Sequence, residues 1–449
     1  MYSILLSFIL AGAAIVLAAP STVDAPRRDS WEECEARMNG ELPYYVPTGF
    51  NFSGNVRRYY VAAELVTWDY APSGWDNWLG VPMEESFRAQ TRGYIHNDTT
   101  IGTKYDKALY RGYTDASFEE RTEQPDWLGY QGPILRAEVG DMIEIMFVNK
   151  LDHFFSGMHS MGLYYTKEDE GAIYWNGTNS VALGQAVPPG ECFVYKWLVP
   201  AASAPEPGFE SRLWSYHPYV SMYQDQDAGS YGPVIIYNPG KMESVMKQNR
   251  EFIVLYTNNN EWNSFLALHN VRKYIPAVAS QVANVSDQYP RVTRGIGNYS
   301  IWYPQYINVP KTTVTAQMAP EFYPLNGYIY ANNPPFEMCV DDSVIWYLYS
   351  MGTEAHSYHL HGDNLYNPNT RAWTATIPMD PGQMLTTLMT ASNPGWWYLI
   401  CHFNDHLSDG MEANYIVYGG PYGECPLEPL ERGYDDDDDD DDYDDGDYD

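Results

Sequence analysis

The sequence predicts an all-β protein built from two sandwich or barrel domains, and three observations lead to that class. Aromatic residues make up 15% of the 449 residues, and the chain also contains 35 Gly and 31 Pro. Aromatic and β-branched side chains favour strands, while Gly and Pro favour the turns between strands. Short apolar runs bounded by Gly, Pro and Asn recur along the chain, and no long amphipathic helix interrupts them.

An internal duplication divides the chain into two halves. In the first half, segment 132–141 leads into an alternating apolar run and then into a motif at His159. In the second half, segment 335–342 leads into a similar run and then into a motif at His359. Each half then closes on an aromatic strand that carries a histidine. We therefore expect each half to form one β domain.

The boundary between the two domains is expected at the turn 238–240. Asn, Pro and Gly occupy this turn, and an apolar strand follows at 251–256. The expected domains are therefore 25–240 and 241–420. At about 150 residues per domain, the length of the chain allows two or three domains.

The N-terminus has the features of a signal peptide. Residues 3–17 form an apolar run followed by small residues, and this run is too short to cross a bilayer. We predict a signal peptide at 1–18 and a secreted protein, with an uncleaved anchor as the alternative. No later segment has the ~20 apolar residues of a membrane span. The chain also contains five Asn-x-Ser/Thr sequons, as a secreted glycoprotein would, at Asn51, Asn97, Asn176, Asn284 and Asn298.

The C-terminal segment 434–449 is a poly-Asp tail that contains 12 Asp. Like charges at this density repel one another, so the tail is expected to be disordered and solvated. Two roles remain open for it. It could keep the protein soluble, or it could bind hard cations such as calcium, which prefer carboxylate oxygens.

The overall charge restricts the class of partner. The formal net charge is −33 at pH 7. Nucleic acids and anionic membranes attract basic surfaces, so the composition argues against both. Metal ions, mineral surfaces and basic matrix proteins are the partners that this charge favours.

The strongest chemical pattern is a set of copper-binding residues in the second half. Cys401, His406 and Met411 follow one another along a strand and the loop after it, and His356 lies on an upstream strand. One Cys, two His and a Met form the ligand set of a blue-copper electron-transfer site. The alternative is a buried thiol among hydrogen-bonded core histidines. Seven of the ten histidines fall in four short motifs, which favours copper.

These motifs carry a family resemblance. The strings at 401–411 and 356–362 resemble the copper motifs of multicopper oxidases. In the first half, the segments 59–74, 101–115 and 167–174 resemble ceruloplasmin, hephaestin and the related coagulation-factor A domains. The similarity covers residues 57–418. It implies two cupredoxin domains, equivalent to a first and a last ceruloplasmin-type domain joined directly, with the type 1 copper in the second domain and none in the first.

The same resemblance implies a three-copper cluster held by eight histidines. Five of the eight positions keep histidine in this chain, at His159, His217, His359, His361 and His402. The other three positions hold Met161, Tyr219 and Ile400. An aliphatic side chain cannot bind copper and a thioether prefers Cu(I), so we do not expect a working cluster. Either one copper remains on His159 and His359, or these histidines are relics in a packed interface.

Other features of the family are only partly present. Asp405 occupies the position of an acid that is used in iron binding and electron uptake beside the type 1 histidine, and its alternative role is to cap a surface loop. Met318 and Tyr323 stand at the nearest positions to the remaining iron ligands. The family's first-domain calcium site is not expected, because the stretch between Glu170 and Glu191 has no acid.

The cysteine count is odd, and Cys401 as a copper ligand accounts for the unpaired thiol. The other four cysteines, at 34, 192, 339 and 425, allow three disulfide pairings. By the resemblance, Cys192 and Cys339 are half-cystines whose usual partner positions lack Cys. A Cys34–Cys425 bond would join the two ends of the chain.

Two function classes follow from the sequence. The first is a secreted copper oxidoreductase that oxidises a metal ion or a small reductant at a type 1 site. The second is a non-catalytic acidic matrix or biomineralisation protein that binds calcium or mineral through its tail. The ceruloplasmin-like ring contains six cupredoxin domains, so three copies of this chain would complete one as a homotrimer. A monomer with packed domains is the alternative.

Overall fold

The computed structural model describes residues 28–173, 183–221, 223–279, 294–296, 299–301 and 318–431. The predicted signal peptide and the poly-Asp tail lie outside these residues, as do the sequons at Asn176, Asn284 and Asn298.

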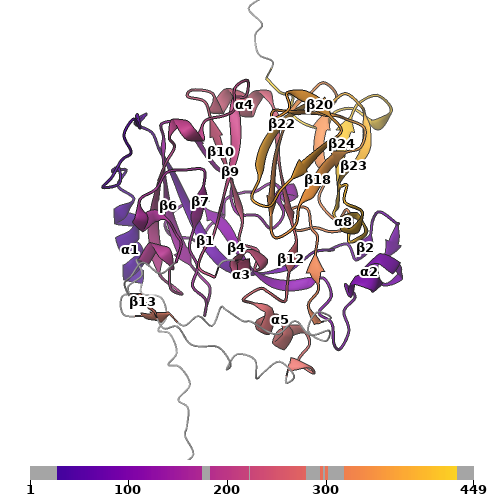
Figure 1. The fold of residues 1–449 in the computed structure, drawn as a ribbon, viewed down its shortest axis with the longest axis horizontal. Helices are drawn as coiled ribbons and strands as arrows, with labels where there is room; N and C mark the ends of the chain where they lie inside the picture. The colour runs from indigo at the N-terminus through magenta and orange to yellow at the C-terminus, as the bar shows by residue number, and fades with distance from the viewer. Residues whose placement is uncertain are drawn as a thin grey trace, which may run out of the picture.

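The first half of the chain forms two four-stranded sheets (Figure 1). The outer sheet has the order β4-β1-β6-β8, with β1 at Val56–Asp69, β4 at Lys104–Tyr113, β6 at Met142–Asn149 and β8 at Cys192–Leu198. The inner sheet has the order β5-β10-β9-β7, with β5 at Leu135–Glu138, β7 at His159–Met161, β9 at Ser211–His217 and β10 at Gly232–Tyr237.

The second half repeats this plan with two five-stranded sheets. One has the order β11-β17-β22-β19-β20, made of Arg250–Thr257, Ser343–Met351, Met384–Thr390, Leu365–Asn367 and Ala372–Thr374. The other has the order β16-β24-β23-β18-β21, made of Phe336–Cys339, Glu412–Tyr418, Gly395–Cys401, His356–Leu360 and Thr376–Met379.

The duplication seen in the sequence is also a duplication of strand pairing. The first strand of each half pairs in parallel with a strand that follows it, β1 with β6 and β11 with β17. The last strand of each half also pairs in parallel, β10 with β5 and β24 with β16. The expected all-β, cupredoxin-like class is confirmed. The turn 238–240 lies between β10 and β11, and the assignment of domains to 25–240 and 241–420 stays a prediction.

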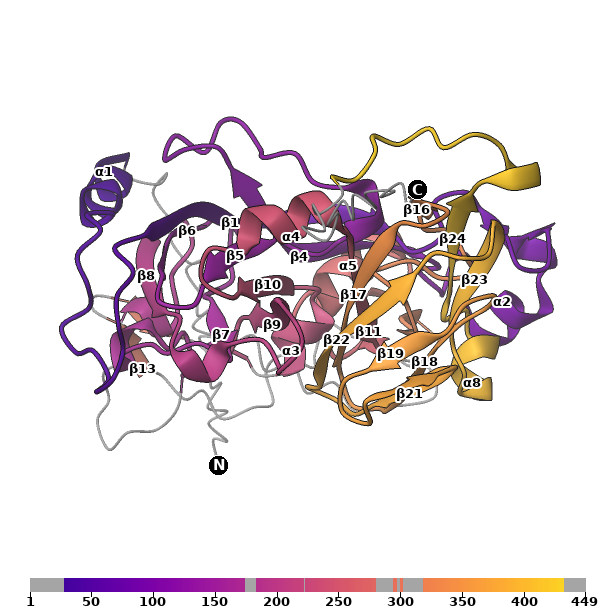
Figure 2. The ribbon, with the colours of Figure 1, turned by 90° about the horizontal axis from the view of Figure 1, so that it is seen from above.

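The four sheets stack as successive layers, and alternate side chains of one strand fill different cores. On β17, Ile345 and Tyr347 face the first half, whereas Trp346 and Leu348 face the last sheet. This alternation follows from the two-residue period of a strand. The contact between the halves is also polar, because Leu213 N donates to Thr386 Oγ1 at 3.1 Å. Figure 2 shows the order of the layers from β8 and β6 to β23 and β24.

Helices are short and lie between or beside the sheets. The described α-helices are α1 at Arg28–Arg37, α2 at Phe87–Arg92, α3 at Tyr223–Asp227, α4 at Met242–Gln248, α5 at Ala267–Tyr274 and α8 at Asn404–Ser408. The remaining described strands are β2 at Trp75–Asp76, β3 at Val81–Pro82, β12 at Asn259–Asn260, β13 at Arg294–Ile296, β14 at Tyr299–Ile301 and β15 at Glu321–Phe322.

Residues 70–93 form an arm that carries β2, β3 and α2 from the first half to the second. In Figure 2 the arm lies beside β23 and α8. Ser86 begins α2 by accepting a hydrogen bond from the Ala89 amide, and Gly93 ends it at φ 74°. The Asn77 amide donates to the Tyr330 carbonyl at 3.2 Å, which anchors the arm to the second half.

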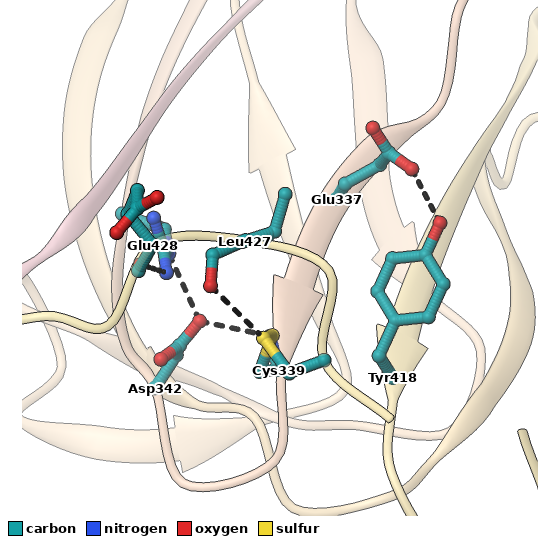
Figure 3. Close-up of a disulfide and its surroundings, with 8 residues drawn as sticks. Glu337, Cys339, Asp342, Tyr418, Leu427 and Glu428 are labelled. Atoms are coloured by element: carbon teal, nitrogen blue, oxygen red, sulfur yellow. Dashed lines mark hydrogen bonds and ion pairs between the residues drawn. A yellow bond between two sulfur atoms is a disulfide. The ribbon is translucent and has the colours of Figure 1, made fainter. Parts of the chain in front are cut away.

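The disulfides correct one expectation from the sequence. Cys34 pairs with Cys192, and Cys339 pairs with Cys425 (Figure 3), so the Cys34–Cys425 bond was wrong. The physical reason is that α1 packs against β8, which begins at Cys192, while the chain after β24 returns past the end of β16. Each bond therefore stays within one half. Cys401 is the unpaired cysteine, and it is buried.

Candidate metal centre

Three strands and one helix of the second half bring the predicted type 1 ligands together. His356 begins β18, Cys401 ends β23, His406 lies on α8 and Met411 immediately precedes β24. The strands β18 and β23 pair with Tyr358 opposite Cys401, which sets His356 near the thiol.

The distances between the ligand atoms suit a single metal ion. The Cys401 Sγ lies 3.8 Å from His356 Nδ1 and 3.5 Å from His406 Nδ1. The three ligand atoms all lie within 4.8 Å of one another, and in the described part of the chain this is the one such group of three His, Cys, Asp or Glu residues. Met411 is fully buried and belongs to the same core as Cys401.

Backbone hydrogen bonds hold the ligand loop in a tight form. The Cys401 amide donates to the Met411 carbonyl at 3.1 Å, and the Met411 amide donates to the His406 carbonyl at 3.0 Å. Gly410, directly before Met411, has φ 96°, and a Cβ at this position would lie 2.7 Å from the Tyr330 ring. Glycine is therefore required here both for the backbone angle and for the close approach of the ring.

Burial favours the neutral forms of His356 and Cys401. Desolvation, helped by the neighbouring His406, lowers the pKa of His356 to about 3. Desolvation also raises the pKa of the Cys401 thiol, although hydrogen bonds from the amides of Phe403 and Ser357 oppose it. A neutral imidazole is ready to bind a metal, whereas the thiol must release its proton on binding.

The donor set fits copper. A thiolate, two imidazole nitrogens and a thioether suit a soft or borderline ion, and the His-Cys-His arrangement is that of blue-copper sites. The Ser357 amide lies 3.4 Å from Cys401 Sγ, so it would stabilise a bound thiolate by hydrogen bonding. His356 Nε2 is buried without a hydrogen-bond partner, so the ring is oriented by packing against Tyr256 at 5.5 Å.

A carboxylate that sequence reasoning missed lies beside His406. The Nε2–H of His406 donates to Glu354 Oε2 at 2.7 Å. Because a carboxylate only accepts, the proton sits on Nε2 and the lone pair of Nδ1 faces Cys401. Tyr323 stacks on the His406 ring at 4.5 Å, and its hydroxyl donates to Glu354 Oε1 at 3.3 Å. The sequence feature that could have indicated this contact is an acidic residue two positions before the predicted ligand His356.

Asp405, the predicted electron-uptake acid, is exposed on α8. It shares with Glu354 and His406 the lining of a cavity of about 530 Å³, together with Phe403. Glu354, rather than Asp405, makes the hydrogen bond to the predicted copper ligand. The cavity therefore brings two carboxylates to the edge of the His406 ring.

The five cluster histidines form two separate sets. His159 and His217 face each other across β7 and β9, with ring centroids 5.6 Å apart. Their Nδ1 atoms lie 2.6 Å from the Glu170 carbonyl and 2.9 Å from the Pro218 carbonyl, so each Nε2 keeps a lone pair. Desolvation lowers the pKa of both, that of His217 to about 4.

The second set comprises His359, His361 and His402. The His359 ring lies 5.1 Å from that of His361 and 5.2 Å from that of His402. The Nδ1 of His359 donates to the Ala375 carbonyl at 2.7 Å, which again leaves Nε2 with its lone pair. His359 and His361 line a cavity of about 500 Å³.

The two sets lie in different layers of the molecule. His159 and His217 belong to the inner sheet of the first half, and the second set belongs to the sheet that contains β18 and β23. The sheet of β11, β17 and β22 lies between these two, because β9 packs against β22 and β17. Figures 1 and 2 both place β7 and β18 in different halves of the molecule.

Comparisons with known proteins agree with this architecture. Two multicopper oxidase family models match residues 127–241 and 303–420. The ferroxidase HEPHL1 of Mus musculus is 32% identical, over 82% of this chain and 30% of its own length. Ceruloplasmin of Rattus norvegicus is 33% identical, over 85% and 34%, and hephaestin of Homo sapiens is 30% identical, over 81% and 29%.

The chain belongs to the ceruloplasmin- and hephaestin-like multicopper oxidases. It spans about a third of the length of these curated relatives. The solved structure of the multicopper oxidase mgLAC shares the fold, with a TM-score of 0.50 and 15% identity over 82% of this chain and 88% of that one. Membership of the multicopper oxidase family implies copper as the cofactor. None of the helices described is both long enough and apolar enough to cross a membrane.

Proposed function

We propose that the protein is a secreted copper oxidoreductase with one type 1 copper, which oxidises a metal ion or a small reductant. The observation that carries the proposal is the convergence of Cys401 Sγ with the Nδ1 atoms of His356 and His406. Copper held there by these three residues and Met411 would supply one-electron chemistry between Cu(II) and Cu(I).

The cavity beside His406 supports a cationic reductant. Glu354 and Asp405 line it, and no lysine or arginine does. Opposite charge raises the local concentration of a cation in such a cavity. Glu354 also fixes the tautomer and the orientation of His406, which is the ligand nearest to the substrate. In this proposal Glu354 and Asp405 bind the substrate and position it beside the edge of the His406 ring.

Two disulfides support an extracellular location. Cys34–Cys192 and Cys339–Cys425 are structural bonds of a kind that persists in oxidising compartments. Secretion is therefore part of the proposal, together with the predicted signal peptide.

Copper stoichiometry and visible absorption test the proposal directly. We expect about one copper per chain and an intense thiolate-to-copper band in the reconstituted protein. Cys401→Ser should abolish the band, because a hydroxyl cannot replace the soft thiolate. A colourless copper-loaded protein would contradict the type 1 site, and about four coppers per chain would instead indicate a complete oxidase cluster.

The separation of the two histidine sets favours an assembly of several copies. We infer that His159 and His217 of one copy face the His359, His361 and His402 set of another in a homotrimer. Neither set alone gathers three ligand atoms as closely as the type 1 group does. One residual copper on His159 and His359 would then lie between copies.

The second candidate function is a non-catalytic acidic matrix or biomineralisation protein. The 12 Asp of segment 434–449 and the net charge of −33 favour it. In this case the tail would bind calcium or mineral, and the copper site would be silent or absent. Oxidation of a reductant by the Cu(II)-loaded protein, with an external electron acceptor added to permit turnover, decides between the two classes.

A further inference from the structure

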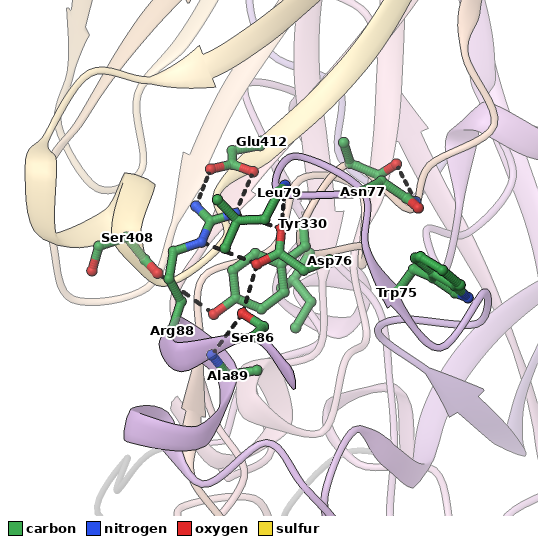
Figure 4. A network of polar contacts seen from close by, with 12 residues as sticks. Trp75, Asp76, Asn77, Leu79, Ser86, Arg88, Ala89, Tyr330, Ser408 and Glu412 are labelled. Atoms are coloured by element: carbon green, nitrogen blue, oxygen red, sulfur yellow. Dashed lines mark hydrogen bonds and ion pairs between the residues drawn. The ribbon is translucent and has the colours of Figure 1, made fainter. Parts of the chain in front are cut away.

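The loop that carries two of the type 1 ligands is contacted by the first half of the chain. This loop, residues 404–412, contains His406 and Met411. The contacting element is the arm of residues 70–93, whose helix α2 lies next to the loop (Figure 4). Two arginines of α2, Arg88 and Arg92, reach the loop.

Arg88 joins the two halves through a buried pair of carboxylates. Its Nη2 donates to Asp76 Oδ1 at 2.6 Å, and its Nη1 donates to Glu412 Oε1 at 2.6 Å. Asp76 and Glu412 are fully buried, and Arg88 is 9% exposed. Asp76 also accepts from Ser86 Oγ at 2.7 Å, so the carboxylate within the arm is itself held in place.

Arg88 also touches the backbone of the ligand loop. Its Nη1 donates to the carbonyl of Leu407, the residue after His406, at 3.2 Å. Its guanidinium lies 4.6 Å from the centre of the Tyr330 ring, the ring that requires glycine at position 410. Glu412, the main partner of Arg88 in the second half, directly follows Met411.

Arg92 holds the same loop at a second point. Its guanidinium forms a two-pronged ion pair with Asp409, whose side chain is almost fully buried. Asp409 lies between His406 and Met411 in the sequence, and its amide donates to the His406 carbonyl at 3.1 Å. Arg92 thus contacts the loop at Asp409, between the two proposed ligands, and Arg88 contacts it at Glu412, directly after the second one.

We propose that Arg88 and Arg92 are positioning residues that set the geometry of the type 1 copper from the other half of the molecule. The inference rests on the proposed type 1 site and adds a determinant of that site. Fork-shaped guanidinium pairs fix orientation as well as distance, and buried carboxylates cannot exchange these partners for water. The arm therefore restricts where the His406 imidazole and the Met411 thioether lie.

The experiment compares the full-length, copper-loaded protein with Arg88→Met and Arg92→Met. Methionine keeps most of the apolar stem and removes the guanidinium. The matched control is Arg57→Met, at β1 of the outer sheet of the first half, which breaks an ion pair of 2.7 Å to the buried Asp141 just before β6. Copper affinity is measured by competition with a chelator, and the site is monitored by its paramagnetic resonance and visible absorption spectra.

We expect copper affinity to fall by about 10-fold in Arg88→Met, the lower end of the range for residues that hydrogen-bond a metal ligand directly, because Arg88 acts through Leu407 and Glu412. The copper hyperfine splitting and the band ratio should also change. Arg92→Met should change the same spectra less, since Arg92 is more exposed. Arg88→Lys, which keeps the charge but loses the fork, should fall between wild type and Arg88→Met. Arg57→Met should leave affinity and spectra unchanged.

One result would contradict the positioning role, and a different result would contradict the proposed function. If the wild-type protein shows the type 1 band and the variants at 88 and 92 retain wild-type affinity and superimposable spectra, the positioning role is wrong. If the wild-type protein itself lacks the band, the proposed function fails. Should Arg88→Met not fold, Arg92→Met and Arg88→Lys decide the question by the same spectra.

Discussion

Glu354 lies outside the proposed ligand set, yet it contacts one member of that set, His406, directly. Its hydrogen bond to His406 Nε2 selects the tautomer whose Nδ1 can bind copper. Its second oxygen accepts from Tyr323, which stacks on the same imidazole. The site thus depends on a carboxylate and a phenol that are not ligands themselves.

Glu354→Gln tests this role at the residue scale. The amide keeps the shape but can present its NH2 group to His406, so we expect copper affinity to fall about 10-fold or more. Oxidation of a cationic reductant should slow further, because one negative charge leaves the cavity. Chelator competition and steady-state kinetics measure the two effects.

Asp405→Asn is the matched comparison for that variant. Asp405 lines the same cavity but is exposed and has no hydrogen bond to His406 among the described contacts. The Asp405→Asn variant should bind the cationic substrate more weakly, while its copper affinity should be unchanged. Equal loss of copper affinity in both variants would contradict the assignment of Glu354.

At the scale of elements, a buried carboxylate of the first half binds two side chains of α5. Asp106 of β4 accepts from Lys273 Nζ at 2.6 Å and from His269 Nε2 at 2.7 Å, both on α5. Burial would raise the pKa of Asp106, but these bonds and that of Thr67 lower it to about 2. The helix is therefore held by an ionised group.

Asp106→Asn should lower the free energy of unfolding at neutral pH by about 2 kcal/mol. This figure follows because the pKa of Asp106 is nearly two units lower in the folded protein than in the unfolded chain. A depressed pKa stabilises the fold above the unfolded value near 4, and this stabilisation is lost as the pH falls through about 2. The deficit measured by urea unfolding should therefore shrink by roughly half between pH 7 and pH 3. A deficit independent of pH would contradict the ionic attachment, and Asp152→Asn, at an exposed site, is the control.

The poly-Asp tail is the second element with a testable role. Deletion of 434–449 should leave the thermal midpoint nearly unchanged, because 12 Asp in this segment cannot form a packed core. The same deletion should reduce adsorption of calcium or of a calcified surface, because it removes clustered carboxylates. Undiminished adsorption by the truncated protein would show that the tail is not the cation-binding element.

At the scale of the whole molecule, four stacked sheets keep the two histidine sets apart. The sheet of β11, β17 and β22 packs side chains into the cores on both of its faces. A histidine on one side of this sheet therefore cannot reach a metal ion on the other side. If these histidines share a metal ion, they must do so between copies of the chain. The lost ligands and the charge of −33 work against that association.

Light scattering at physiological ionic strength tests the homotrimer. We expect a mass near three times 51.2 kDa plus glycan, because screening at this ionic strength, with a Debye length of about 8 Å, reduces repulsion between copies. A mass near 51.2 kDa plus glycan that does not change with concentration would rule the trimer out. Lower salt should weaken the assembly if charge opposes it.

The sequence by itself determined the β class, the duplication and the set of ligand types. The class and the duplication follow from patterns repeated along the chain, and most of the proposed ligand set is local, because Cys401, His406 and Met411 lie on one strand and the loop after it. Only the tertiary structure decided that Glu354 contacts His406, that Cys339 pairs with Cys425, and that Arg88 on α2 of the first half forms an ion pair with Glu412 in the second. Such contacts join segments far apart in the chain, and their geometry is fixed by how the sheets pack, which no short motif encodes.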